Sequence, residues 1–183
     1  MFDRILVPLD GSPASNAALP LVKTLARATG GSVTLLRVSL PGESAPDLEA
    51  GLGRIRDGLA YTDIQVQAAV RIGDPADEIL AARCRAVVTD RIVADSGVPV
   101  VLMRAGERRI TQLRTLLVPL DGSPGGVVAL GTAIGLAKAT GAAVRLLQVV
   151  VPIPMGSVTD AVVRSAHCPV LTIHATQRVP PIS

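Results

Sequence analysis

Two aspartates, Asp10 and Asp121, lie in a seven-residue stretch, VPLDGSP, that occurs twice in the chain, at Val7–Pro13 and at Val118–Pro124. Each copy follows a short apolar run and precedes an apolar pattern of helical period, which predicts a strand, a tight turn and a helix N-terminus. Ligands of open α/β sheets bind beyond the carboxyl ends of strands, and helix N-termini attract anions. The stretch therefore predicts an anion site, most obviously for a phosphate, although either aspartate could instead only shape an Asx turn.

Catalytic chemistry has little support among the remaining residues. Ser12 and Ser123 lie where helix N-caps are expected, and a nucleophilic serine would need a positioned base. His167 and His174 are the only histidines, and both are far from these serines in the sequence. We therefore expect no catalytic residue and a structural position for His167 at the entry to a strand.

The other acidic residues and the cysteines favour structural roles over metal binding. Asp74, Asp77 and Glu78 belong to the stretch IGDPADEIL, in which Asp74 is expected to cap a helix. No histidine accompanies them at a spacing that suits a metal ion. Cys84 and Cys168 form no CxxC motif and are expected to be buried free thiols in a reducing compartment.

The composition is typical of an α/β protein with an aliphatic core. Apolar residues make up 49% of the 183 residues, yet Phe2 and Tyr61 are the only aromatics. The net charge is +3, but no basic stripe with neighbouring aromatics is evident, so nucleic-acid binding is not expected. No apolar run approaches the ~18 residues that span a bilayer, and no secretory segment opens the chain, which predicts a cytoplasmic protein without membrane partners.

Apolar periodicity predicts alternating strands and helices in the first half of the chain. Strands are expected at residues 4–9, 32–39, 64–70, 85–89 and 98–103. Helices are expected from Pro13 to the glycines at 30–31, from Pro75 to about residue 83, and at 90–96. Residues 41–60 also have a helical pattern, but their many glycines weaken that prediction.

The second half of the chain repeats the first with an offset of 111 residues over one strand, one helix and a second strand. The offset then falls to 70, because VTDRIVADSGVPVV at 88–101 matches VTDAVVRSAHCPVL at 158–171. The second copy is thus 41 residues shorter and lacks a third strand, a third helix and a fourth strand. We expect tandem domains at 1–104 and 115–175, a linker at 105–114 and a loose tail at 176–183.

Together these stretches resemble the universal stress protein family. The resemblance rests on VPLDGSP between a strand and a helix, on IGDPADEIL in the middle and on GSVTDAVVRSAHCPVLTIH near the end. It implies an α/β fold of two tandem Rossmann-like domains, similar to the adenine nucleotide alpha hydrolase fold. Each parallel sheet would have the strand order 3-2-1-4-5, and the second copy would be incomplete.

Some members of that family bind ATP, and the resemblance implies which residues of this chain would do so. The acidic residue after the first strand would contact the nucleoside, and the backbone at the end of the second strand would meet the base. A glycine loop of the form G-x2-G-x9-G-[ST] would wrap the phosphates, with Mg²⁺ as a companion ion. The candidate cofactor-binding residues are Pro8, Leu9, Asp10, Val38, Pro119, Leu120, Asp121, Val149, Gly156 and Ser157.

The chain departs from the family's glycine pattern. No glycine lies between Cys84 and Gly97, and in the second copy only Gly156–Ser157 matches the end of the motif. Either the loops have been lost, in which case no cofactor is expected, or the sequence lacks segments that the natural protein contains. We favour missing segments, because VTD is retained in both copies and a sheet without its fourth strand would leave an open apolar edge. A measured mass equal to that of this sequence would exclude that explanation.

Three classes of function are compatible with these features. The favoured one is a tandem universal stress protein, a cytoplasmic nucleotide-binding module of the stress response with at most weak ATP hydrolysis. The second is an interaction module without nucleotide, which would self-associate through the apolar last strands Val98–Met103 and Cys168–Ile173, or pair them within one chain. An enzyme related to adenylate-forming pyrophosphatases has the least support, since its first loop would be richer in serine and glycine than DGSP.

Overall fold

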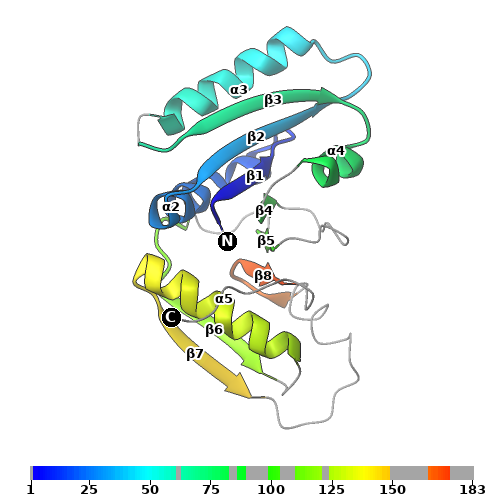
Figure 1. Ribbon diagram of the computed structural model, residues 1–183. Coiled ribbons are helices and arrows are strands. Elements are labelled where there is room, and N and C mark those ends of the chain that lie inside the picture. Colours follow the sequence, from blue (N-terminus) through cyan, green and yellow to red (C-terminus); the bar gives the residue numbers. More distant parts are fainter. Residues whose placement is uncertain are drawn as a thin grey trace.

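The chain forms a six-stranded sheet with helices on both faces, and a separate pair of strands beside one long helix (Figure 1). The computed structural model describes residues 2–60, 63–82, 86–89, 99–103, 110–120, 124–148 and 165–173. The predicted α/β class with parallel strands is confirmed in these parts of the chain.

The six-stranded sheet has the order β3-β2-β1-β4-β5-β8, so its first five strands follow the order 3-2-1-4-5. These five strands are parallel, whereas β8 runs antiparallel to β5. The chain winds outward in one direction from β1 to β3 and in the other direction from β4 onward, which places the carboxyl end of β1 beside the point of reversal. The strands are β1 (Arg4–Pro8), β2 (Ser32–Ser39), β3 (Val66–Ile72), β4 (Ala86–Thr89), β5 (Val100–Leu102) and β8 (Val170–Thr172).

The two faces of this sheet are covered by different helices. The helices are α1 (Pro13–Asn16), α2 (Leu19–Thr29), α3 (Ala45–Ala60) and α4 (Pro75–Ala81). Val7 and Leu35 belong to the main core, which also contains leucines of α2 and α3. Leu6 and Leu36, one residue away on each strand, lie on the opposite face with Ile79 of α4. This alternation is what the period of two along a strand requires.

The single helix predicted from Pro13 to the glycines at 30–31 is wrong in one respect, because it is divided into α1 and α2 around residues 17–18. Pro20 explains the division, since it lacks an N–H and its ring would clash with the carbonyl four residues earlier in a continuous helix. Proline is tolerated in a first turn, and Pro20 accordingly lies at the beginning of α2. The repeat has Gly131 at the equivalent position, and α5 (Pro124–Thr140) is unbroken.

The weak helical prediction for residues 41–60 is confirmed, since α3 forms in spite of its glycines. Leu52 and Leu59 are 4% and 8% exposed and belong to the main core. Burial of a leucine side chain contributes about 1.5–3 kcal/mol, whereas a glycine in a helix costs about 1 kcal/mol relative to alanine. Packing of the apolar side of α3 on β2 and β3 therefore outweighs its poor intrinsic propensity.

The smaller part of the molecule is the parallel pair β6 (Thr115–Leu120) and β7 (Ala143–Gln148), with α5 beside it. Leu136 of α5 is 7% exposed and belongs to the main core, and Leu113 packs against the same core. Thr24 of α2 donates a hydrogen bond to the carbonyl of Thr111 (2.9 Å). The two parts are therefore in contact through α2, and the end of the expected linker takes part in that contact. The domain boundaries themselves stay a prediction.

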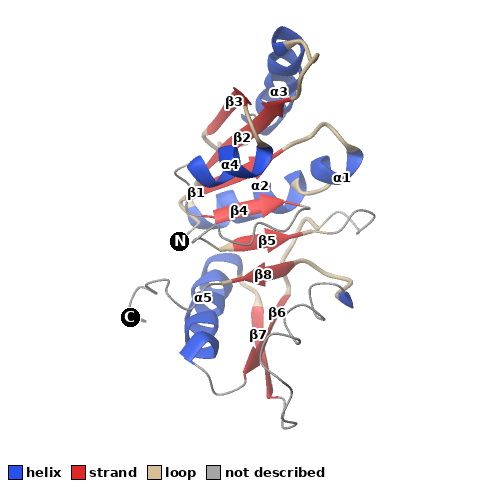
Figure 2. Ribbon diagram, turned by 90° about the vertical axis from the view of Figure 1, so that its right-hand side faces the viewer, coloured by secondary structure: helices blue, strands red, loops and turns tan. Residues whose placement is uncertain are grey.

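The last strands of the two repeats pair with each other inside this single chain (Figure 2). Val100 of β5 lies opposite Thr172 of β8, and the hydroxyl of Thr172 donates a hydrogen bond to the carbonyl of Val100 (3.2 Å). The pairing covers the edge of β5, as expected if the apolar last strands meet within one chain. Association between chains through these strands stays a prediction.

Cys168 departs from the expectation of a buried thiol, because it is exposed. Together with the exposed His167, it lies in the turn that precedes β8. Cys84, the helix expected at 90–96 and the tail at 176–183 lie outside the described residues. Among the helices that the structure describes, none has both the length and the apolar character needed to cross a membrane.

Candidate functional site

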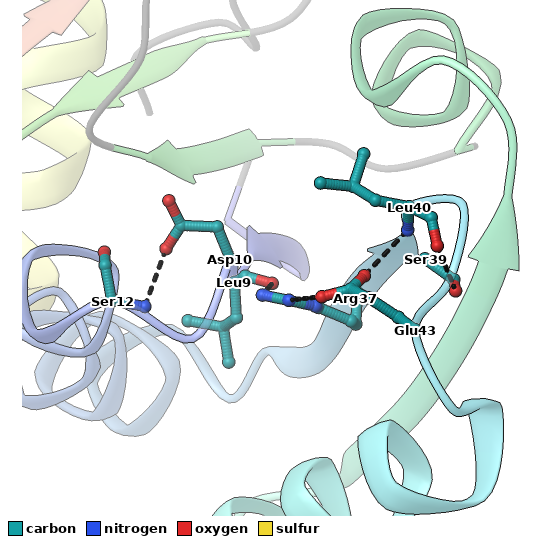
Figure 3. Close-up of polar contacts among 7 residues, drawn as sticks. All are labelled: Leu9, Asp10, Ser12, Arg37, Ser39, Leu40 and Glu43. Carbon is teal, nitrogen blue, oxygen red and sulfur yellow. Dashed lines mark hydrogen bonds and ion pairs between the residues drawn. The ribbon is translucent and has the colours of Figure 1, made fainter.

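The carboxyl end of β1 leads into a tight turn that places Asp10 at the edge of the sheet (Figure 3). Leu9 extends the strand, since its N–H donates a hydrogen bond to the carbonyl of Leu36 (2.8 Å). Gly11 then adopts a φ of 83°, a left-handed conformation that costs glycine little. The exposed Asp10 accepts a hydrogen bond through Oδ1 from the N–H of Ser12 (2.9 Å). The turn is therefore an Asx turn, with the second carboxylate oxygen directed away from the Ser12 N–H.

Ser12 caps α1 as predicted, but this helix is too short to attract an anion strongly. The hydroxyl oxygen of Ser12 accepts a hydrogen bond from the N–H of Ser15 (3.1 Å). Only four residues form α1, and the charge at a helix terminus arises from many aligned peptide dipoles. An anion at this edge therefore needs a further positive group. Ser123 lies outside the described residues.

Arg37 of β2 supplies positive charge beside the same turn (Figure 3). Its side chain is only 13% exposed, and Nη1 donates a long hydrogen bond to the carbonyl of Leu9 (3.4 Å). A methyl group on Gly11 would lie 3.2 Å from the same nitrogen, so the guanidinium group packs directly against the turn. Nη2 forms an ion pair with Oε1 of Glu43 (2.6 Å).

Glu43 connects the loop after β2 to Arg37. Its second oxygen, Oε2, accepts a hydrogen bond from the N–H of Leu40 (2.7 Å). Both contacts favour the ionised carboxylate, so the pKa of Glu43 is below its ordinary value of 4.5, first because of the Leu40 N–H and second because of Arg37. The two oxygens of this carboxylate thus hold the loop in place and pair with the guanidinium group of Arg37.

Glu43→Gln is expected to lower the melting temperature slightly, because the amide keeps an acceptor for Leu40 but loses the ion pair. The pKa of Glu43 is lower in the folded than in the unfolded protein, so its stabilisation is complete above the ordinary value of 4.5 and disappears as the pH falls through the lowered value. Thermal unfolding of the wild type and the variant, measured from above pH 4.5 downward, should show a difference in melting temperature that disappears at acid pH. If the two melting temperatures still differ by the same amount after Glu43 of the wild type has been protonated, the ionised carboxylate is not the source of the stabilisation.

Part of the predicted cofactor-binding set lies together at this edge. Pro8, Leu9 and Asp10 form the end of β1 and its turn, and Val38 lies near the end of the neighbouring β2, packed against the core on the α4 side. Pro119 and Leu120 instead end β6 in the separate strand pair. The rest of the set lies outside the described residues, namely Asp121, Val149, Gly156 and Ser157.

The site residues predicted from the sequence do not include Arg37 and Glu43, although the position of Arg37 within a strand could have indicated it. It interrupts the otherwise largely apolar strand SVTLLRVS, and a buried arginine requires a partner. The partner could not be identified without the structure, because the loop that brings Glu43 back to β2 has no regular pattern.

A hollow of about 460 Å³ lies at the opposite edge of the sheet, lined by Ala26, Arg27, Gly30, Gly31, Ser32, Asp63, Ile64 and Gln65. It lies at the amino ends of β2 and β3, whereas ligands of open α/β sheets bind at the carboxyl ends. The edge that carries Asp10 and Arg37 is therefore the better candidate site. Within the described parts of the chain, no three side chains of His, Cys, Asp or Glu are grouped as metal ligands would be.

Comparison with known proteins agrees with the fold and gives a family match for the first part of the chain. Residues 1–88 match the Universal stress protein family. These residues, just under half of the chain, are therefore similar to the universal stress protein family. The resemblance inferred from VPLDGSP and IGDPADEIL is thereby confirmed, since both stretches lie within the matched residues. The tandem arrangement of two such domains stays a prediction.

Solved structures resemble this chain in fold. A universal stress protein from Archaeoglobus fulgidus DSM 4304 has a TM-score of 0.68 and 18% sequence identity, covering 90% of this chain and 73% of that one. A protein of unknown function from Pseudomonas aeruginosa PAO1 has a TM-score of 0.66 and 16% identity, covering 89% of this chain. This chain spans 66% of the length of the Pseudomonas structure, just under two thirds. No curated protein matches the chain significantly.

Proposed function

We propose that this chain is a universal stress protein and a regulatory module that binds an adenine nucleotide at the carboxyl edge of its six-stranded sheet. The observation that carries the proposal is the Asp10 turn, which is exposed and packed against the largely buried side chain of Arg37. A carboxylate accepts hydrogen bonds from hydroxyl groups such as those of a ribose. β2 continues to Ser39 beyond the last residue of β1 with which it pairs, Pro8. This extension supports the proposal that the backbone of Val38 meets the edge of a base.

The proposed role is regulatory binding in the cytoplasm rather than catalysis. β4 runs from Ala86 to Thr89 as one strand, so no glycine loop interrupts this chain between Val87 and Thr89. Without that loop, a nucleotide lacks the backbone N–H groups that would orient its phosphates for hydrolysis. We accordingly expect at most weak turnover of ATP, with Mg²⁺ accompanying the bound nucleotide.

Asp10→Asn is expected to weaken ATP binding about tenfold, because hydrogen bonds to a charged acceptor contribute about 1.5–3 kcal/mol and those to a neutral one less. Asparagine keeps the oxygen that accepts from Ser12, so the turn should be preserved. Titration calorimetry with ATP and Mg²⁺ measures the change. Asp57→Asn is the matched control, because the side chain of Asp57 is 61% exposed and lies near the C-terminal end of α3, away from the Asp10 turn. No heat of binding by the wild-type protein at high concentration would contradict the proposal.

A second candidate function, an interaction module that binds no nucleotide, is favoured by the pairing of β5 with β8. In this reading the two copies form within one chain what separate domains would form as a dimer. Light scattering combined with size exclusion should then show a monomer, and Leu171→Lys should change its assembly or stability, because Leu171 packs against the main core. An unchanged elution profile and melting temperature of that variant would reject this candidate.

A further inference from the structure

We propose that Arg37 binds a phosphate group of the ligand, and that Glu43 occupies Arg37 as an internal substitute for that phosphate until the ligand displaces it. This inference rests on the proposed nucleotide site and deepens it, because it assigns the charge that takes the place of the missing glycine loop. The ligand group is an anionic phosphate, carried by a nucleotide or free in solution.

The hydrogen bonds of the Arg37 guanidinium group leave part of its binding capacity unused. Nε and Nη2 lie side by side and form the fork that binds two oxygens of one carboxylate or phosphate. Nη2 contacts Oε1 of Glu43 (2.6 Å), whereas Nε is buried and has no hydrogen-bond partner among the described residues. Glu43 does not fill both positions, since Nε is without a partner and Oε2 instead accepts from the N–H of Leu40 (2.7 Å). A tetrahedral phosphate has enough oxygens to occupy both nitrogens of the fork.

The Glu43 carboxylate is placed where a competing ligand could displace it. Its side chain is 29% exposed, and it belongs to the loop between β2 and α3 rather than to either element. Ion pairs of this accessibility contribute little net stability, because water compensates separated charges. Arg37 is held more firmly, since it projects from a paired strand and packs against Leu9 and Gly11.

The sequence repeat does not carry this pair. With the offset of 111 residues, Arg37 corresponds to Gln148 and Glu43 to Pro154. Gln148 is an exposed residue at the end of β7. The geometry therefore assigns the phosphate-binding arginine to the first copy, and one such site is expected for each chain.

Calorimetric titrations of AMP, adenosine and inorganic phosphate separate this inference from the proposed function. Glu43→Gln should bind AMP about 3–10-fold more tightly than the wild type, because one competing charge-assisted hydrogen bond is removed. Arg37→Lys should bind AMP at least about tenfold more weakly, because lysine cannot form the fork. Adenosine should bind all three proteins alike. Glu78→Gln is the matched control for Glu43→Gln, because Glu78 is similarly exposed (25% against 29%) and pairs with Arg71 of β3 (3.0 Å). Arg71→Lys is the control for Arg37→Lys at a more exposed arginine of an ion pair.

Each outcome of these titrations decides one of the two claims. With adenosine still bound, equal affinities of wild type and Glu43→Gln for AMP would overturn the displacement of Glu43. Equal affinities of wild type and Arg37→Lys would overturn phosphate binding by Arg37. Both results would leave the nucleotide site standing. Binding of AMP and phosphate that depends on Arg37, with no binding of adenosine, would support the arginine and contradict the nucleoside site. Absence of binding by all three compounds would overturn both. If Arg37→Lys does not fold, the Glu43→Gln comparison decides alone.

Discussion

Val100→Lys is expected to lower the free energy of unfolding by about 3–5 kcal/mol, the usual penalty for a buried charge without a partner. Val100 is 2% exposed and packs with Leu6 and Leu36 on the α4 face of the sheet. It also lies in β5 between β4 and β8, with Thr172 directly opposite. A lysine there must either lose its proton or separate the strands. We therefore expect the pairing of β5 with β8 to be lost together with the packing of the core.

Chemical unfolding followed by far-ultraviolet circular dichroism measures this effect, since the chain has no tryptophan for fluorescence. Val127→Lys is the matched control, because Val127 is 71% exposed on α5 and should change stability by no more than about 0.5 kcal/mol. Similar stabilities of the two variants would show that β5 is not buried between β4 and β8.

Leu35→Ala is expected to destabilise the protein by about 2–5 kcal/mol, the range for removing a fully buried leucine. Leu35 is 0% exposed and lies in β2 between Val7 of β1 and Ala68 of β3. Its side chain belongs to the main core under α2 and α3, so truncation leaves a cavity that paired strands cannot easily close.

The same unfolding measurement tests Leu35→Ala against Leu117→Ala as control. Leu117 also lies in a strand of a parallel pair, but it is 62% exposed on β6. Its truncation should have little effect on stability. Equal losses in the two variants would mean that the strands of the six-stranded sheet do not form the main core.

Local chemistry made much of the fold predictable. Pro75 after Asp74 marked the beginning of α4, and Asp74 does cap it through bonds to the N–H groups of Ala76 and Asp77 (2.8 and 3.2 Å). Apolar periodicity likewise placed the strands of the first copy to within two residues at each boundary. These features depend on residues close together in the sequence, so the sequence alone was enough. The division of α1 from α2 was also predictable in principle from a local signal, because Pro20 is typical of the first turn of a helix.

Features that depend on distant contacts were harder to predict. Formation of α3 depended on packing of Leu52 and Leu59 against a sheet, which outweighs glycine propensity. The Arg37–Glu43 pair depended on the path of an irregular loop. A pattern of residue types cannot specify that path.

The central claim is that an adenine nucleotide binds between the turn after β1 and the loop after β2. Chemical-shift mapping of the isotope-labelled chain during titration with AMP tests this claim most directly. The largest changes are expected at the amides of Asp10, Gly11, Ser12, Ser39 and Leu40. Changes confined to the opposite hollow, at Gly31 and Asp63 to Gln65, or no changes at any concentration of AMP, would contradict it.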